Sequence, residues 1–357
     1  MRLSASAKRV LGITAVGAIL AACSGVSQVA PVGPATGIQN PQSSARVSLI
    51  PHGMRTRGPM PFFGKPAPAT AKRGIYVSQV AGSNILGYKK GQRSNDPAIC
   101  TVPFSIGSVN NVAVDGAGNL IDPDGAAGAI IIGQGPNMCG AEAAMISDPY
   151  GQPVDASSAN ALTGKIAVAN TFDNGSTPGS ISVCTVSAGC KKNLTNPAMD
   201  GVAAVALDNQ GNCWADGINP SIQATLTYFA GCSGGGVQTT GFTNSGPGGI
   251  DIDASGNLVT IDVRGGGSSG TGVVDVYSGC KPACKLLSST PLIAPAIYGH
   301  LNSLHNNKLA VADFDNGQID IYSYSPTGGV TYLYSFNDGL SANLFVEGVA
   351  YNKRSPQ

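Results

Sequence analysis

Three stretches of the chain repeat one phrase: VNNVAVDGAGNLID at 109–122, VAAVALDNQGNCWAD at 202–216 and GGIDIDASGNLVTID at 248–262. In each, an apolar run leads to an aspartate, a Gly-Asn pair follows, and a second apolar run begins. Apolar residues with a period of two predict a half-buried strand, and the Gly-Asn pair favours a tight turn. The phrase therefore predicts a recurring β-hairpin.

Weaker copies extend this repeat along the chain. They read NALTGKIAVAN at 160–170, LNSLHNNKLAVAD at 301–313 and FVEGVAYN at 345–352. Successive turns are 48, 45, 45, 53 and 46 residues apart, falling near Asp115, Thr163, Asp208, Asp253, Asn306 and Asn352. This is the length of one blade of a β-propeller. Third strands are predicted at 84–88, 179–186, 224–231, 272–279 and 317–324. We expect an all-β, six-bladed β-propeller with four-stranded blades.

The two ends of the repeat region complement each other. GIYVSQ at 74–79 is a second strand without a first, and FVEGVAYN at 345–352 is a first strand without a second. Pairing the N- and C-terminal strands would close the ring and remove two unpaired sheet edges. We therefore predict a blade built from both ends of the chain.

Composition excludes several classes of protein. Charged residues make up 11% of the chain, against about 25% in an ordinary soluble domain, and the net charge is +1. No basic field is available for nucleic acid, so no nucleic-acid partner is expected. The 49 glycines and 23 prolines interrupt long helices, while a hydrophobic fraction of 42% permits a large core. We expect a monomeric β protein.

Residues 1–22 have the three parts of an export signal. Arg2, Lys8 and Arg9 precede an apolar run, which ends in Leu20-Ala21-Ala22-Cys23. This resembles a bacterial lipoprotein signal, which implies cleavage before Cys23 and attachment of palmitate and other acyl chains to that residue. An ordinary signal peptide and a short membrane helix are the alternatives. Ser24 after the cysteine favours the outer membrane by the same resemblance.

Residues 23–72 are predicted to be a disordered tether between the lipidated cysteine and the propeller at 73–357. Residues 24–72 contain eight prolines and no acidic residue, and neither strand nor helix periodicity runs through them. The expected location is the bacterial cell envelope, with the chain anchored to a membrane on the periplasmic or cell-surface side.

The cysteines agree with an exported chain. Nine cysteines without Cys23 leave eight, an even number that predicts disulfides in an oxidising compartment. Zinc knuckles and redox motifs would need a two-residue spacing that these cysteines lack. The spacing favours sequential pairing, while other connectivities stay open: Cys100–Cys139, Cys184–Cys190, Cys213–Cys232 and Cys280–Cys284. The Cys213–Cys232 pair has the clearest motive, because antiparallel strands would bring these two positions together.

VAVDGAGNLID and its relatives resemble the repeats of six-bladed NHL and SMP-30/gluconolactonase-like propellers and of bacterial lipoproteins that carry propeller domains. The resemblance covers about residues 73–357. It implies that one position on each inner strand lines the mouth of the central channel. The implied positions are Asn110, Ser158, Ala203, Gly248, His300 and Glu347.

The lactonases hold a divalent metal at this mouth, and the resemblance transfers their ligands only in part. Glu347-Gly348 matches the Glu-Gly of their motif, and Asn110 stands where a ligand asparagine belongs. Gly248 stands where a third ligand is needed, and Asp200 is two or three residues out of register. Two oxygen ligands bind a divalent cation weakly. We therefore expect no cofactor and at most a weak divalent cation.

Other polar residues favour structural roles. Asp251, Asp253 and Asp262 are expected to cap turn amides, and Trp214 is expected to pack between blades rather than bind a sugar. Asp122-Pro123-Asp124-Gly125 favours a tight turn over a calcium loop. The leading interpretation is a binding module for an unknown protein, peptide or glycan. A metal-dependent hydrolase and a structural envelope component are the alternatives, and enzymatic activity is not favoured.

Overall fold

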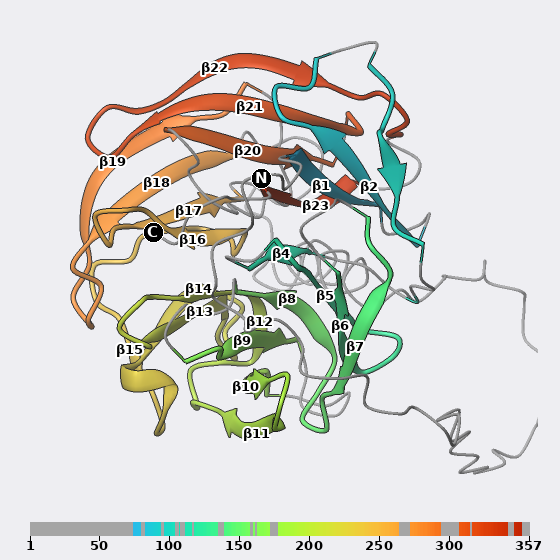
Figure 1. Cartoon of the computed structure of the whole chain (residues 1–357). Coiled ribbons are helices and arrows are strands. Elements are labelled where there is room, and N and C mark those ends of the chain that lie inside the picture. The colour runs from blue at the N-terminus through green and yellow to red at the C-terminus, as the bar shows by residue number, and fades with distance from the viewer. Residues whose placement is uncertain are drawn as a thin grey trace, which may run out of the picture.

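The structure is a computed structural model that describes most of the chain after residue 73. The described residues are 74–79, 83–93, 96–103, 107, 111–115, 118–134, 139–157, 160, 163–171, 178–263, 272–293, 307–314, 316–341 and 346–351. They form six antiparallel sheets arranged in a ring, as Figure 1 shows. The predicted all-β, six-bladed propeller is therefore confirmed.

Blades 1 to 3 each contain four strands, ordered from the inner to the outer strand. Blade 1 is β23 (Val346–Tyr351), β1 (Gly74–Gln79), β2 (Asn84–Lys89) and β3 (Cys100–Thr101). Blade 2 is β4 (Ala113–Val114), β5 (Leu120–Asp124), β6 (Ala129–Gly133) and β7 (Glu142–Ser147). Blade 3 is β8 (Pro153–Ala156), β9 (Ile166–Asn170), β10 (Ser180–Thr185) and β11 (Gly189–Leu194).

Blades 4 to 6 complete the ring. Blade 4 is β12 (Gly201–Leu207), β13 (Cys213–Ile218), β14 (Ala224–Phe229) and β15 (Val237–Gln238). Blade 5 is β16 (Ile250–Ile252), β17 (Leu258–Asp262), β18 (Val273–Ser278) and β19 (Lys285–Pro291). Blade 6 shows β20 (Lys308–Asp313), β21 (Gln318–Ser325) and β22 (Gly329–Phe336). Its inner strand, predicted before the turn near Asn306, lies outside the described residues.

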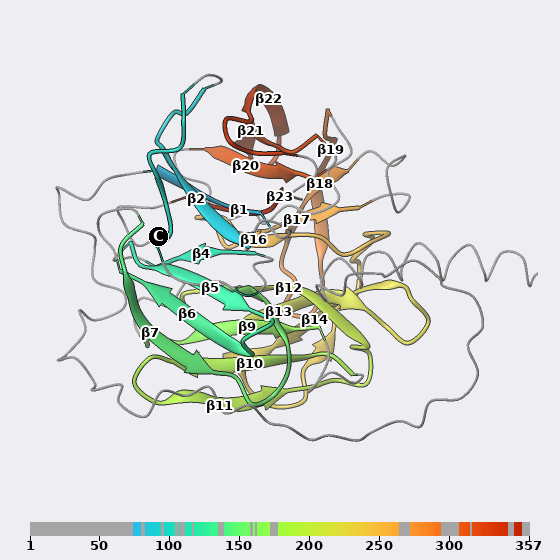
Figure 2. The ribbon, with the colours of Figure 1, turned by 90° about the vertical axis from the view of Figure 1, so that its right-hand side faces the viewer.

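The ring closes as predicted. The C-terminal strand β23 pairs antiparallel with β1, and Ile75 lies opposite Tyr351. β1 in turn pairs with β2, so both ends of the repeat region belong to one sheet. Figure 2, which views the ring from its side, shows β1, β2 and β23 close together in blade 1. β1 is therefore paired on both sides, and β23 is the inner strand of blade 1.

The repeated Asp-x-x-Gly-Asn phrase folds into the same turn in blades 2, 4 and 5. In each turn the aspartate Oδ1 accepts a hydrogen bond from the backbone N–H of the asparagine four residues later, at 2.7–2.8 Å. The asparagine Nδ2 donates to the aspartate Oδ2 at 2.8–2.9 Å. The glycine between them has a positive φ, which only glycine adopts without strain. The pairs are Asp115–Asn119, Asp208–Asn212 and Asp253–Asn257.

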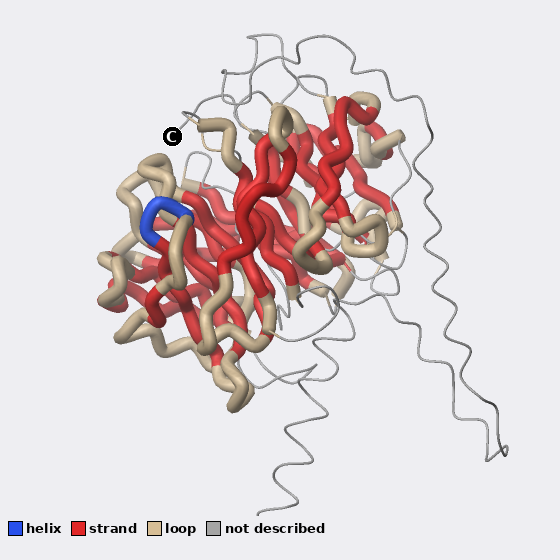
Figure 3. The backbone as a smooth tube through the Cα atoms, turned by 90° about the horizontal axis from the view of Figure 1, so that it is seen from below, coloured by secondary structure: helices blue, strands red, loops and turns tan. Residues whose placement is uncertain are grey.

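The core lies between neighbouring blades rather than in the middle of the ring. Second strands such as β1, β13 and β17 are buried along their whole length, because blades cover both of their faces. Their neighbours pack into clusters at the blade interfaces, such as Ile261, Val276 and Tyr322 between blades 5 and 6. Outer strands keep exposed residues, as β11 does. Figure 3 shows the strands and the one described helical turn, η1 (Ala230–Cys232).

Four disulfides join the pairs that the sequence predicts. Two bridges each lie within one blade: Cys184–Cys190 in blade 3 and Cys213–Cys232 in blade 4. Cys280–Cys284 closes a short loop after β18. Cys100–Cys139 joins blade 1 to blade 2. Together the bridges indicate an oxidising, extracytoplasmic environment. Within the described part of the chain, no helix has the length and apolar character needed to span a membrane.

Candidate functional site

The structure describes only one of the four polar residues predicted at the channel rim, Glu347. Asn110, Ser158 and His300 lie outside the described residues, as does Cys23. In blade 3 the inner strand β8 ends at Ala156, which is earlier than the expected rim position at 158. Glu347 lies on β23, where one extra residue is accommodated opposite Ser78 and Gln79. Ala203 occupies the matching extra position in β12.

Glu347 is more deeply buried than a residue facing water in the channel mouth should be. Its side chain is 5% exposed, and its Oε1 has no hydrogen-bond partner. Burial raises the pKa of Glu347 well above the usual range of a glutamate, so the protonated form is favoured. A buried carboxyl that favours its protonated form is a poor ligand for a cation unless further ligands surround the ion.

Three other polar residues come together on the inner strands, which surround the centre of the ring in Figure 1. Asp155 on β8 accepts hydrogen bonds from the backbone N–H of Ala156 at 2.8 Å and of Val205 on β12 at 2.7 Å. The Asn111 side chain is also hydrogen-bonded to Asp155. The third residue, Asp251 on β16, lies close enough for its charge to act on Asp155.

The environment of Asp155 favours its protonated form. Loss of solvation raises the pKa of Asp155 well above its usual range, and the negative charge of Asp251 adds to this rise. Hydrogen bonds from Val205, Ala156 and Asn111 act in the opposite direction. Asp155 thereby ties the inner strand of blade 3 to that of blade 4. Sequence reasoning missed the group formed by Asn111, Asp155 and Asp251, although Asn111 is one residue from the predicted Asn110.

In the described part of the chain, Glu347 and Asp200 do not belong to one group of His, Cys, Asp or Glu ligands. There, one group of three His, Cys, Asp or Glu side chains places its ligand atoms within 4.8 Å of one another, and it contains neither Glu347 nor Asp200. Asp200 precedes β12, and its backbone N–H donates to the Ile218 carbonyl at the end of β13. A bulge in β12 next to Asp200 could have brought this residue into register with the rim positions. The bulge in β12 lies instead between Val202 and Ala204.

Buried carboxyl groups are frequent at the blade interfaces. They include Asp122, Asp124, Asp216, Asp262, Asp275, Asp313 and Asp320. Within the described ranges, no Lys, Arg or His side chain is buried to balance them. Asp122 is fully buried, and neither of its carboxylate oxygens has a hydrogen-bond partner. Desolvation raises the pKa of Asp122 and of Asp216 well above the usual range, and a neighbouring aspartate adds to each rise.

Some of these aspartates have the structural roles that the sequence predicts. Asp253 caps its turn, and Asp262 accepts hydrogen bonds from the backbone N–H groups of Ser245 and Gly246. Asp124 accepts one from Ala127 within a tight turn, as expected for the Asp-Pro-Asp-Gly segment. Asp251 differs, because it accepts a hydrogen bond from the amide of the next residue, Ile252, within the strand itself.

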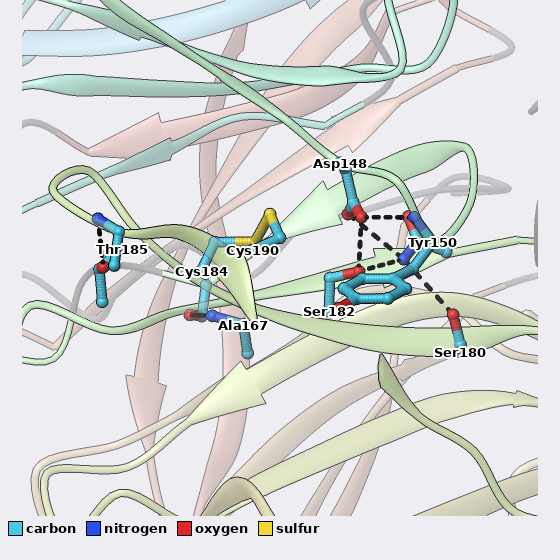
Figure 4. The surroundings of a disulfide bond; sticks show 11 residues. Asp148, Tyr150, Ala167, Ser180, Ser182, Cys184, Thr185 and Cys190 are labelled. Atoms are coloured by element: carbon cyan, nitrogen blue, oxygen red, sulfur yellow. Dashed lines mark hydrogen bonds between the residues drawn. A yellow bond between two sulfur atoms is a disulfide. The ribbon is translucent and has the colours of Figure 1, made fainter. Parts of the chain in front are cut away.

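The group of three potential metal ligands lies between blades 2 and 3. It consists of Asp148, Cys184 and Cys190, all buried. Figure 4 shows the Asp148 carboxylate beside the Cys184–Cys190 bridge, with Ser182 and Tyr150 turned toward it. Asp148 Oδ1 accepts hydrogen bonds from the Ser182 hydroxyl at 2.8 Å and from the Tyr150 backbone N–H at 3.0 Å. In the oxidised chain the two sulfurs are bonded to each other.

Comparison with known proteins supports the fold and leaves the activity open. No family model matches the chain, and no curated protein does. A chain of a crystallised nidogen/laminin complex superposes with a TM-score of 0.60 at 11% identity, over 80% of this chain and 100% of that one. A chain of a mitotic checkpoint complex gives 0.50 at 12% identity, over 87% and 90%. A gluconolactonase from Xanthomonas campestris gives 0.48 at 16% identity, over 72% and 82%, too low to carry an argument.

Proposed function

We propose that the chain is an extracytoplasmic binding module, a propeller that presents an interaction surface on its outer strands. The observation that carries this proposal is a set of exposed apolar side chains on neighbouring blades. Leu286 on β19 is 43% exposed, and Leu333 on β22 is also 43% exposed. Tyr332 beside Leu333 and Ile293 after β19 are exposed as well. Ile293 and Tyr332 lie toward the same end of the two strands, because the Ile293 N–H donates to the Tyr322 hydroxyl at 3.4 Å and the Tyr322 ring packs edge-on against that of Tyr332. Exposed apolar side chains that lie together in this way are typical of sites that bind another protein.

The two outer strands are held next to each other. The Thr290 Oγ1 accepts a hydrogen bond from the backbone N–H of Val330 at 3.4 Å, and the Ser288 hydroxyl donates to the Pro326 carbonyl at 3.3 Å. These hydrogen bonds hold the outer strands of blades 5 and 6 in a fixed arrangement, and with them the exposed side chains. The propeller neighbours belong to protein complexes, which is consistent with this proposal.

The predicted lipid anchor at the N-terminus would determine where this module is located. Lipidation at Cys23 would attach it to a membrane, and the tether to residue 72 would let the ring reach a partner in the envelope. The four disulfides agree with such an exported location. In this proposal the protein is monomeric, and its partner is a protein, peptide or glycan of the same envelope.

The outer-strand surface is tested by cross-linked capture of envelope proteins on the full chain. A double variant, Ile293→Ser with Leu333→Ser, should lose the captured partner because it removes the apolar surface. Val237→Ser is the matched control, since Val237 is 54% exposed on the outer strand of blade 4, away from this surface. Equal capture by all three proteins would contradict the proposal.

A second function has a specific observation in its favour. Asn111 and Asp251 both interact with Asp155, and carboxylate and amide oxygens are ligands of hard cations. An SMP-30-like, metal-dependent hydrolase would use such a group at the channel mouth. Metal analysis together with lactone hydrolysis separates this alternative from the binding module.

A further inference from the structure

We propose that the Cys184–Cys190 bridge covers a zinc site which forms when the bridge is reduced. Asp148, Cys184 and Cys190 each offer one ligand atom, and these atoms lie within 4.8 Å of one another. Tetrahedral zinc with bonds of about 2.3 Å to sulfur needs its ligand atoms about 3.8 Å apart. The three atoms thus need only small movements, which opening of the bridge itself supplies.

The groups around the cluster hold the Asp148 carboxylate in place beside the two sulfurs. The Ser182 hydroxyl and the Tyr150 amide fix the Asp148 carboxylate through Oδ1. Asn170 Nδ2 donates to Asp148 Oδ2 at 3.4 Å. Asn170 Nδ2 also donates to the Ser182 hydroxyl at 2.7 Å, so the carboxamide is held beside the carboxylate. Water would occupy the fourth position around the ion.

The chemistry of this ligand set selects zinc and similar ions. Two thiolates and one carboxylate suit a borderline-soft divalent ion and disfavour calcium or magnesium, which prefer oxygen. The surroundings add to this preference, because no Lys, Arg or His is buried within the described residues to neutralise two thiolates. A bound divalent ion would neutralise most of their charge.

Formation of the site takes two balanced steps. A thiolate of an external dithiol attacks Cys190, which keeps 8% of its surface exposed, and the Cys184 thiolate leaves. The second thiol of the reagent then releases Cys190, so the dithiol becomes a disulfide and the protein gains two thiols. Zinc binding converts these thiols to thiolates and releases two protons to solvent. The protein would thereby report a reducing, zinc-containing environment by changing its blade 2–blade 3 interface.

The test uses Co²⁺ as a spectroscopic probe on the full chain in detergent. Every sample carries Cys23→Ser, which removes a thiol outside the described residues. A limiting amount of a dithiol is added, and alkylation mapping identifies the opened bridges. Opening of Cys184–Cys190 should produce the intense visible bands of tetrahedral, thiolate-bound Co²⁺, displaced by one equivalent of Zn²⁺. The oxidised chain should show no such bands.

Two variants separate this site from the other cysteines. Asp148→Asn keeps every thiol and should weaken Co²⁺ binding at least about tenfold, because the charged ligand is lost. Cys280→Ser with Cys284→Ser removes a bridge outside the three-ligand group and should leave binding unchanged. Equal affinity in Asp148→Asn overturns the proposal. Loss of the folded ring when only Cys184–Cys190 opens also overturns it, because the site requires the intact blade interface.

Discussion

The indole Nε1 of Trp214 in blade 4 donates a 2.7 Å hydrogen bond to the carbonyl oxygen of Cys280 in blade 5. The ring is 2% exposed, and the Lys281 ammonium lies 5.5 Å from its centroid. Lys281 also forms a 2.8 Å ion pair with Asp208, in the turn that precedes β13. The lone tryptophan therefore joins two blades, as its sequence context predicts, and the Cys280–Cys284 loop is the part of blade 5 that receives it.

Replacing Trp214 by phenylalanine should destabilise the ring by about 2 kcal/mol, because the buried Cys280 carbonyl loses its donor. The free energy of unfolding from urea titration measures this loss. Lys281→Met is the control, and it should cost less than about 1 kcal/mol because the Lys281 side chain is 41% exposed. A larger loss for Lys281→Met than for Trp214→Phe would show that the ion pair, rather than the indole, holds the two blades together.

Deleting residues 346–357 should unfold the whole propeller. The deletion removes β23, so β1 loses one of its two partners and the edges of blade 1 and its neighbours become exposed. Circular dichroism should show loss of the cooperative thermal transition. Deletion of residues 353–357 alone leaves β23 in place and should preserve the transition. A truncated chain lacking β23 that melts near the temperature of the full chain would contradict closure of the ring.

Removing the disulfides one at a time should rank them by the length of chain that each encloses. The sequence separations are 39 for Cys100–Cys139, 19 for Cys213–Cys232, 6 for Cys184–Cys190 and 4 for Cys280–Cys284. On the chain-entropy account the paired alanine variants should lose about 3.9, 3.2, 2.2 and 1.9 kcal/mol in that order. Urea titration of the four variants checks the ranking. Equal losses would indicate that native packing around each bridge outweighs the entropy of the unfolded chain.

Turns within a blade were predictable from the sequence, whereas contacts between blades were less predictable. The Asp208–Asn212 turn is specified by five consecutive residues, so its repeats reveal both the blades and their number. Closure follows from the apolar patterns of β1 and β23. In contrast, Asp155 reaches Val205 across a blade interface, at a place where a bulge shifts the strand register. No short sequence pattern reports such a bulge, so counting back from the turns does not reveal this contact.

Stability should fall as the pH rises from about 4 to about 7. Burial, with a contribution from the charge of Asp313, raises the pKa of Asp320 from 3.8 to about 7. The folded chain therefore binds this proton more tightly than the unfolded chain, and the stabilisation present below about pH 4 is lost as the pH passes 7. Asp122, Asp155 and Asp216 are shifted in the same direction.

The variant Asp320→Asn should flatten this dependence. The difference in unfolding free energy between the variant and the wild type should shift in favour of the variant by on the order of 2 kcal/mol between pH 5 and pH 8. Urea titration at both pH values measures this shift. Asp96→Asn is the control, because Asp96 is part of an exposed pair with Lys89 and should leave the profile unchanged. An unchanged slope in Asp320→Asn would assign the pH dependence to other buried carboxyls.

The last prediction separates the binding module from the hydrolase. Glu347→Gln should leave the metal content of the purified chain and any lactone hydrolysis unchanged. In the described part of the chain, no group of three His, Cys, Asp or Glu ligands includes Glu347, and the burial of Glu347 favours a protonated carboxyl that a glutamine can replace.

Because the pKa of Glu347 is raised in the folded chain, the same variant should be more stable than the wild type at pH 8 and about equally stable at pH 5. Asp155→Asn is the informative comparison, since Asp155 accepts hydrogen bonds from two backbone amides and its loss should destabilise the ring at either pH. Metal analysis, a lactone hydrolysis assay and urea titration on the three proteins test all of this. Stoichiometric calcium or zinc that disappears in Glu347→Gln together with lactone hydrolysis would establish the hydrolase and reject the binding module as the main function.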